Sequence, residues 1–264
     1  VKEDVHVFTI KDSDDAAAGR LIGDIRDCLF RVVPQMSYNS WKELTKFKAA
    51  KDGEQTHTTL EELQEKVKQE EIQNEARKAN KSFVRYGDVI QLQHVKSGKY
   101  LTIMPKQTAR MERDARRVCL QHGGVYSAFL TQPFYKYKSV GDPLLFDEQV
   151  TLSSQKLGPR WIFHASLSDD HKLPESVRGS TLYEVNCSTD DSGCFYPVLY
   201  SRGVSHLQCG HLVRFMYPQS ALVLGASCTL DKAKRPFLRR TETEKPTSLE
   251  GLWSKGIWLI ESPK

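Results

Sequence analysis

Residues 86–102 read YGDVIQLQHVKSGKYLT, a stretch with the pattern of a β-hairpin. Its first half, from Tyr86 to Leu92, reads as a short strand with Val89, Ile90 and Leu92 as apolar positions. Ser97 and Gly98 then form a turn signal, and Lys99–Thr102 supplies the returning strand. This part of the chain is therefore predicted to be β-structure.

Two further segments resemble this hairpin. One begins at residue 147, turns near Gly158 and returns through Trp161–Phe163, and the other begins at residue 210, turns at 218–220 and returns through Leu222–Leu224. Ile90, Val150 and Val213 are equivalent positions, 60 and 63 residues apart. Strand pairs that repeat at a nearly fixed interval are typical of a β-trefoil or a related all-β architecture. The pattern alone places all three repeats in one trefoil.

A helical segment interrupts this pattern between about residues 38 and 80, where Lys, Glu, Gln and Ala replace β-branched residues. A capping box is available to Thr58 with Glu61 or to Thr59 with Glu62. A narrow apolar stripe of Leu60, Leu63 and Val67 follows. We predict helices at 38–50 and 59–80, separated by the loop 51–54, as a solvated hairpin that protrudes from the β body. Strands are also predicted at 1–10 and 27–33.

Composition narrows the classes of function. With 38 Lys and Arg against 33 Asp and Glu, the net charge of +5 favours anionic partners without indicating nucleic acid. No apolar run is long enough to span a bilayer, so this region is predicted to be soluble. The chain starts at Val1, and we expect it to be part of a longer protein. The six cysteines form no C-x-x-C pair, which predicts reduced thiols, no disulfide and no metal site.

No catalytic motif is present. The sequence contains no G-x-S-x-G, no P-loop and no H-E-x-x-H pattern, so we expect neither an enzyme nor a cofactor. The polar feature of interest is the run 232–241, which has five cations and ends in Thr241. Such a run either holds a multiply phosphorylated ligand through charge-assisted hydrogen bonds or is a solvated basic loop.

Several of these motifs together resemble one known family. Residues 26–31 (RDCLFR), 86–102 and 132–142 (QPFYKYKSVGD) are similar, in order, to the N-terminal region of inositol trisphosphate receptors, and the runs at 184–187 and 210–215 fit the same order. Ryanodine receptors are the sister family. The resemblance implies a mainly β fold: a suppressor-type β-trefoil over 1–203 with a helix-turn-helix arm at about 38–80, followed at 204–264 by the first portion of a second, ligand-binding trefoil.

The resemblance also implies site residues. In the loop 132–142, Tyr135, expected to be exposed, and Lys136 fall where the family contacts neighbouring subunits; the alternative for Tyr135 is a packed aromatic at a strand end. The resemblance implies a phosphate site. Its residues either stand at the family's phosphate-binding positions or could replace a donor that is missing there: Arg214, Arg239, Arg240, Thr241 and Lys245. Arg239 and Thr241 match the family pattern F-L-R-T-T-G-R, whereas Glu242 replaces its glycine and Thr243 its last arginine. Because an acidic side chain repels phosphate, we expect weaker binding, with Arg240 or Lys245 compensating.

The implied function is that of the cytosolic regulatory and ligand-binding region of an intracellular calcium-release channel in the endoplasmic reticulum membrane. Its implied partners are inositol trisphosphate, other domains of the channel and neighbouring subunits of a homotetramer, with no nucleic acid. Two alternatives remain. One is a ryanodine-receptor-like region that does not bind inositol trisphosphate. The other is a lumenal trefoil that binds sugars, which the glycosylation sequons at Asn80 and Asn186 allow.

Overall fold

The computed structural model describes residues 25–49, 59–146, 148–167, 183–189, 193–199, 205–218, 222–225 and 238–240. Within these residues the fold is mainly β, with two α-helices and two short 3-10 turns. The helices and turns are α1 (Asn39–Ala49), α2 (Leu60–Ala79), η2 (Ile25–Cys28) and η3 (Val125–Ser127). The strands are β1 (Phe30–Pro34), β2 (Val89–His94), β3 (Tyr100–Thr108), β4 (Arg116–Gln121), β5 (Phe129–Pro133), β6 (Val150–Ser154), β7 (Gly158–Leu167), β8 (Tyr183–Ser188), β9 (Tyr196–Leu199), β10 (Leu212–Tyr217), β11 (Leu222–Leu224) and β12 (Leu238–Arg240).

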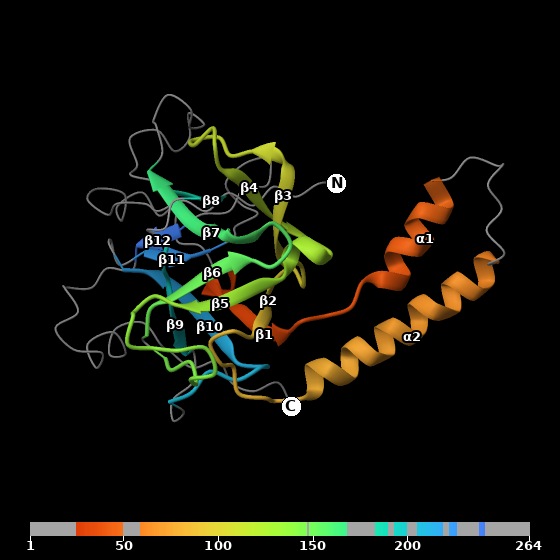
Figure 1. The fold of residues 1–264 in the computed structure, drawn as a ribbon, viewed down its shortest axis with the longest axis horizontal. Helices are drawn as coiled ribbons and strands as arrows, with labels where there is room; N and C mark the ends of the chain where they lie inside the picture. Colours follow the sequence, from red (N-terminus) through yellow and green to blue (C-terminus); the bar gives the residue numbers. More distant parts are fainter. Residues whose placement is uncertain are drawn as a thin grey trace.

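Seven of the strands close into a barrel, in the order β2-β3-β4-β8-β7-β6-β5 and back to β2 (Figure 1). Closure is made where β2 pairs with β5, through Val89 opposite Leu130 and Ile90 opposite Phe129. Strand β1 pairs with β2 along its whole length and with β10 at its start, and β10 continues to β11 and β12. The mainly β fold predicted from the hairpin pattern is confirmed.

The three predicted hairpins are present as β2–β3, β6–β7 and β10–β11. The strand predicted at 27–33 is shifted, because residues 25–28 form η2 and pairing with β2 begins only at Phe30 opposite His94. The strand predicted at 1–10 lies outside the described residues.

A ring of backbone hydrogen bonds joins the segments that precede the three hairpins. The amide of Val84 donates to the carbonyl of Leu207 (2.8 Å), that of Leu207 to Leu144 (2.9 Å), and that of Leu144 back to Val84 (3.0 Å). These residues are 60 and 63 residues apart, the same spacing as the repeated hairpins, and all three are buried. The ring therefore relates the three repeats by an approximate threefold arrangement.

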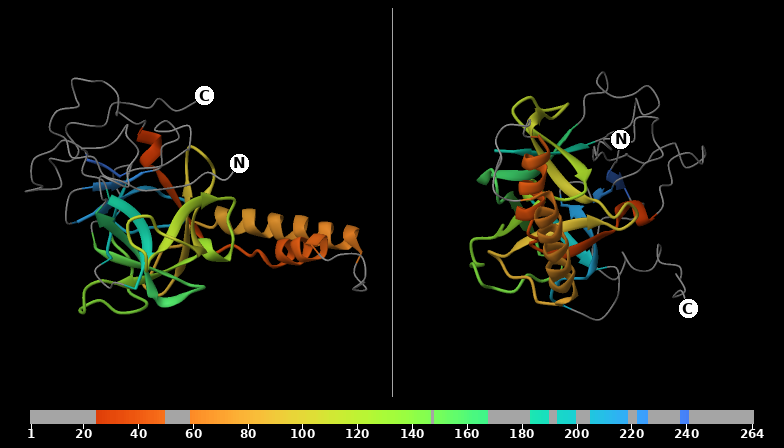
Figure 2. Two further views of the ribbon diagram at one scale, coloured as in Figure 1. Left: turned by 90° about the horizontal axis from the view of Figure 1, so that it is seen from above. Right: turned by 90° about the vertical axis from the view of Figure 1, so that its right-hand side faces the viewer.

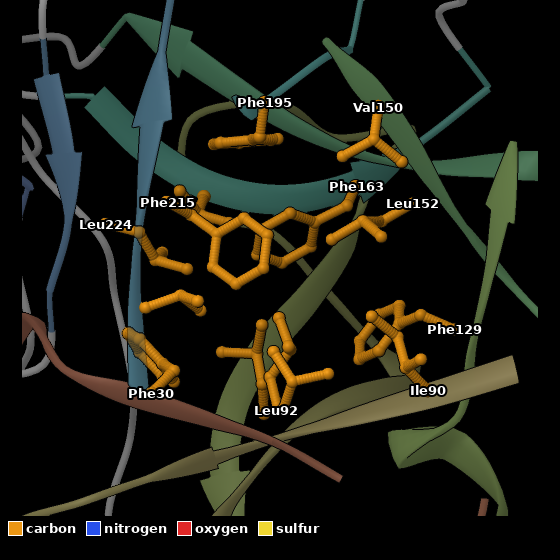
Figure 3. Packing of buried hydrophobic residues seen from close by; sticks show 14 of the residues in the cluster. Phe30, Ile90, Leu92, Phe129, Val150, Leu152, Phe163, Phe195, Phe215 and Leu224 are labelled. Carbon is orange, nitrogen blue, oxygen red and sulfur yellow. The ribbon is translucent and has the colours of Figure 1, made fainter. Parts of the chain in front are cut away.

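A single interior receives the apolar side chains of all three repeats (Figure 3). Ile90, Val150 and Val213, the equivalent positions of the hairpins, are each at most 2% exposed and belong to the same cluster. Phe163 and Phe195 pack with ring centroids 5.0 Å apart. Strands β10 and β11 thus share their core with the seven-stranded barrel. The domain boundary near residue 203 stays a prediction.

The helices form an arm that projects from the barrel (Figure 2). Their positions agree with the prediction, and of the two candidate capping boxes the one formed is that of Thr59 with Glu62. In the predicted stripe Leu63 is buried, whereas Leu60 is 41% exposed. Apolar burial therefore stabilises the arm little, and another interaction must hold α1 against α2.

That source is a carboxylate of α2 placed at the N-terminus of α1. Glu70 accepts hydrogen bonds from the Ser37 hydroxyl (2.6 Å) and from the amides of Asn39, Ser40 and Trp41 (2.8–3.3 Å). These amides are the ones that a helix leaves without an internal partner, and the helix dipole favours a negative charge there. Burial raises the pKa of Glu70, but the hydrogen bonds outweigh burial and the net shift is downward.

The base of the arm is fixed to the barrel by Gln91 of β2. Its side-chain oxygen accepts hydrogen bonds from the Met36 amide and from the Tyr38 hydroxyl, both at 3.1 Å. Burial raises the pKa of Tyr38 to about 12. Gly123 lies against the same hydroxyl, since a Cβ there would be 2.6 Å from it. The base of the arm is thus tightly packed against the barrel.

Candidate functional site

The loop between β5 and β6, residues 134–142, has the features of an interaction site. Its backbone forms two successive turns, with the Lys138 amide donating to the Tyr135 carbonyl and the Asp142 amide to the Ser139 carbonyl, both at 3.1 Å. The Asp142 carboxylate accepts a further bond from the Ser139 amide (2.8 Å). Arg85, on the neighbouring segment, donates to the Gly141 carbonyl (2.9 Å). The loop therefore has a defined shape without a partner.

Three aromatic side chains stack along this loop. The ring of Tyr135 lies edge-on to Phe134 (5.3 Å between centroids, 82° between planes) and parallel to Tyr137 (5.3 Å, 15°). Tyr135 is half-buried, whereas Tyr137 is 72% exposed and Val140 is 77% exposed. The expectation that Tyr135 is exposed is therefore wrong, because its neighbours cover it; Lys136 is exposed. The solvent-exposed ring of this aromatic stack is that of Tyr137.

An ion pair holds the loop on the barrel. The ammonium of Lys138 lies 2.7 Å from a carboxylate oxygen of Glu148, and the Tyr86 hydroxyl donates to the other oxygen (3.3 Å). Burial raises the pKa of Tyr86, and the negative charge of Glu148 raises it further. The hydroxyl therefore stays protonated and can act as a donor. Gly87 is needed here: its φ is +96°, and a Cβ would lie 2.6 Å from a methyl carbon of Val140.

The predicted phosphate residues are described only in part. Arg214 lies on β10, half-buried, opposite Val198 of β9. Arg239 and Arg240 lie on β12, which pairs with β11, and β11 pairs with β10. The fold therefore places the backbones of these three arginines in one sheet, on β10 and β12, with β11 between these two strands. Thr241 and Lys245 lie outside the described residues. The predicted site thus remains a prediction.

Sequence reasoning missed Tyr137, Val140 and Glu148. The alternation Tyr135-Lys136-Tyr137-Lys138 was a usable signal, because in an exposed loop it places two rings two residues apart where they can stack. The side-chain partners of Glu148, Lys138 and Tyr86, are 10 and 62 residues away and could not be found from the local sequence.

None of the helices in the described ranges is both long and apolar enough to cross a membrane. In the same ranges no group of three or more His, Cys, Asp or Glu side chains is placed to hold a metal ion.

Comparison with known proteins identifies the family to which the chain belongs. The family model described as "Inositol 1,4,5-trisphosphate/ryanodine receptor" matches residues 2–192. The chain belongs to the inositol 1,4,5-trisphosphate/ryanodine receptor family, which confirms the resemblance inferred from the motifs. A particular relative is the inositol 1,4,5-trisphosphate receptor itr-1 of Caenorhabditis elegans, 26% identical over 251 residues. The alignment covers 89% of this chain but only 8% of the relative.

Two solved structures have partly similar backbones. The SDF2-like protein from Arabidopsis thaliana matches with a TM-score of 0.47 and 15% identity, covering 61% of this chain and 91% of its own. A Caenorhabditis elegans protein of unknown function matches with a TM-score of 0.45 and 12% identity, covering 56% of this chain and 82% of its own. At TM-scores below 0.5, neither likeness bears on the fold or the function of this chain.

Proposed function

We propose that this chain is the N-terminal regulatory and ligand-binding region of an intracellular ligand-gated calcium-release channel, on the cytosolic face of the endoplasmic reticulum membrane. The observation that carries the proposal is the family match over residues 2–192. In this function the region is not an enzyme. It binds inositol trisphosphate, other domains of the same channel and neighbouring subunits of a homotetramer.

The proposed mechanism is a shift between two interdomain arrangements. A ligand gates the channel only if it binds one arrangement more tightly than the other. The loop 134–142, with Tyr135 and Lys136, then transmits the favoured arrangement to the next subunit. Its internal hydrogen bonds and its Lys138–Glu148 ion pair support this role, because a loop that is already ordered loses little entropy on binding.

For the fold we propose a β-trefoil with the arm at about 38–80. The ring of Val84, Leu144 and Leu207 supports a trefoil, because its members recur with the spacing of the hairpins. The family resemblance divides the chain into 1–203 and 204–264, with the second part opening another trefoil. The shared core favours the other arrangement, in which β10 and β11 belong to the same trefoil as the earlier strands.

For the ligand we propose a phosphate site built on β10 to β12 and the segment that follows, with Arg214, Arg239, Arg240, Thr241 and Lys245 as donors. The adjacency of β10, β11 and β12 supports the grouping of the three arginines. Guanidinium groups suit phosphate because each can donate two parallel hydrogen bonds.

Calorimetric titration of inositol trisphosphate into the full-length parent protein tests this proposal. We compare the natural sequence with the double variant Arg239→Ala/Arg240→Ala, and with Arg113→Ala/Arg160→Ala as a control that removes the same charge from exposed positions elsewhere. Binding that weakens only in the first variant supports the site. Equal weakening in both variants means that net charge alone attracts the ligand. Absence of binding at low salt by the folded natural protein refutes the ligand assignment.

A ryanodine-receptor-like region without inositol trisphosphate binding is the second candidate. The acidic Glu242 and the neutral Thr243 favour it, because they stand where the family pattern has glycine and arginine. The lumenal sugar-binding alternative loses one of its two supports: Asn186 is fully buried, and its amide donates to Ser166 (2.7 Å), so a folded chain cannot carry a glycan there. Asn80, at the end of α2, is exposed.

A further inference from the structure

The turn that follows the aromatic stack exposes a serine hydroxyl. Ser139 is exposed to solvent, and its hydroxyl makes no hydrogen bond with another residue that the structure describes. The loop that carries it leaves the barrel on the side away from the arm, so the two helices do not cover it (Figures 1 and 2). An enzyme that modifies hydroxyl groups can therefore reach Ser139 in the folded chain.

The residues around Ser139 have the pattern that basophilic protein kinases recognise. Lys136 stands three residues before the serine, Lys138 stands one residue before it, and Val140 follows it directly. Kinases of this class bind cations before the serine with acidic side chains and bind an apolar residue after it in a pocket, and such charge patterns give them specificity. Lys136 is exposed, and Val140 is 77% exposed. Both recognition residues are thus presented to solvent beside the free hydroxyl.

The backbone of Ser139 is held in place by acidic side chains that a phosphate would disturb. The Ser139 amide donates to the Asp142 carboxylate (2.8 Å), and the Ser139 carbonyl accepts from the Asp142 amide (3.1 Å). The preceding residue, Lys138, lies 2.7 Å from a carboxylate oxygen of Glu148. A phosphoserine carries about 1.5 to 2 negative charges at neutral pH. At position 139 it would repel Asp142 and draw Lys138 away from Glu148, so both contacts would weaken.

We propose that Ser139 is a phosphorylation site for a basophilic serine/threonine kinase, and that its phosphate opens the turn of residues 139–142. The phosphoryl donor is ATP, bound to the kinase with Mg²⁺. The Ser139 hydroxyl oxygen bonds to the γ-phosphorus while the bond from that phosphorus to the β,γ-bridging oxygen breaks. ADP leaves, and the hydroxyl proton passes to a carboxylate of the kinase. The site goes beyond the proposed function and does not depend on it, because it needs only the folded loop.

Phosphorylation of the full chain in vitro tests the site. The folded chain is incubated with the catalytic fragment of protein kinase C and MgATP, and mass spectrometry locates the phosphate. Thr45 is an internal control: it is exposed and has Lys42 three residues before it, but its hydroxyl donates to the Trp41 carbonyl (2.8 Å) within α1. We expect phosphate at Ser139 before any at Thr45. Absence of phosphate at Ser139, while hydrogen exchange shows that the barrel is folded, overturns the proposal.

Variants test whether the flanking residues are recognised. Lys136→Ala and Val140→Ala should each lower the initial rate of phosphorylation at Ser139 by roughly fivefold, the effect of one surface ion pair or of about one buried methylene group. The matched control, Lys156→Ala, removes an exposed lysine from the β6–β7 turn and should leave the rate unchanged. Equal rates in all three variants would show that the kinase does not read this pattern, and the proposal would then fail.

Hydrogen exchange tests the effect of the phosphate on the turn. In the fully phosphorylated chain, the amides of residues 139–142 should exchange roughly fivefold faster than in the unmodified chain, the effect of one pair of like charges about 4 Å apart in water. Ser139→Ala, treated with the same kinase, is the control and should show no change. Unchanged exchange in the phosphorylated chain overturns the proposed opening of the turn.

Discussion

Replacing Glu70 by alanine should detach α1 from α2 while leaving the barrel folded. The carboxylate accepts bonds from three amides at the start of α1, and no other side chain among the described residues takes that place. Losing the cap of a helix costs about 1 kcal/mol. Losing a negative charge at its N-terminus costs about 0.5–1 kcal/mol more.

Together these losses amount to about 2 kcal/mol, which raises the fraction of molecules with α1 opened by about 30-fold. The variant Glu70→Gln keeps one acceptor oxygen but not the charge, so it should lose about 1 kcal/mol, or about fivefold. The prediction thus includes that Glu70→Ala opens α1 more than Glu70→Gln does.

Hydrogen exchange followed by mass spectrometry measures this effect on the amides of residues 39–49. The matched control is Glu71→Ala, which makes the same change of residue at an exposed neighbouring position of α2. It reproduces any gain in helix propensity without touching α1. If Glu70→Ala and Glu71→Ala give equal exchange in α1, or if exchange in α1 does not change, the assignment of Glu70 as the cap is refuted.

Three further results are expected. Because hydrogen bonding lowers the pKa of Glu70, protection of α1 in the natural chain should hold above the ordinary glutamate pKa of about 4.3 and be lost as the pH falls below it, whereas Glu70→Gln should show no such loss. Gly123→Ala should lower the free energy of unfolding, measured in urea, by about 2 kcal/mol or more, because φ at this position is +100° and the added Cβ would meet Tyr38. The control Gly98→Ala, at φ +68° and in open space, should lower it by only about 1 kcal/mol. Equal losses in the two variants would exclude the contact between residue 123 and Tyr38. Phe215→Ala should cost about 3–5 kcal/mol and speed exchange in β2 and β6; an effect confined to residues after 204 would instead favour the boundary near residue 203.

The parts of this fold that are local in sequence could be predicted. The arm was visible from composition. Two candidate capping boxes, Thr58 with Glu61 and Thr59 with Glu62, marked the start of α2 because a capping box involves residues three apart. The hairpins were visible because each one has two short strand-like runs joined by turn residues within a short stretch. Even their equivalence, at Ile90, Val150 and Val213, followed from spacing alone.

Features that depend on distant residues could not be predicted. Glu70 lies among many charged residues of α2 and looks like a solvated side chain, yet its partners are about 30 residues earlier in the chain. The exposure of Tyr135 was expected from the family resemblance, and no local pattern shows that Phe134 and Tyr137 cover it. Closure of the barrel by β2 and β5 likewise depends on register, which only the folded chain defines.

The ring formed by Val84, Leu144 and Leu207 has a consequence for biosynthesis. Each of its hydrogen bonds needs a member from another repeat, and the last member lies well into the second half of the chain. During translation this ring therefore cannot form until Leu207 has left the ribosome, by which time the first two repeats have long been exposed. Contacts of such long sequence separation form slowly, and strands that wait for them are prone to aggregate. Nascent chains stalled before residue 207 should accordingly depend on chaperones, whereas chains stalled far enough beyond it should resist proteolysis.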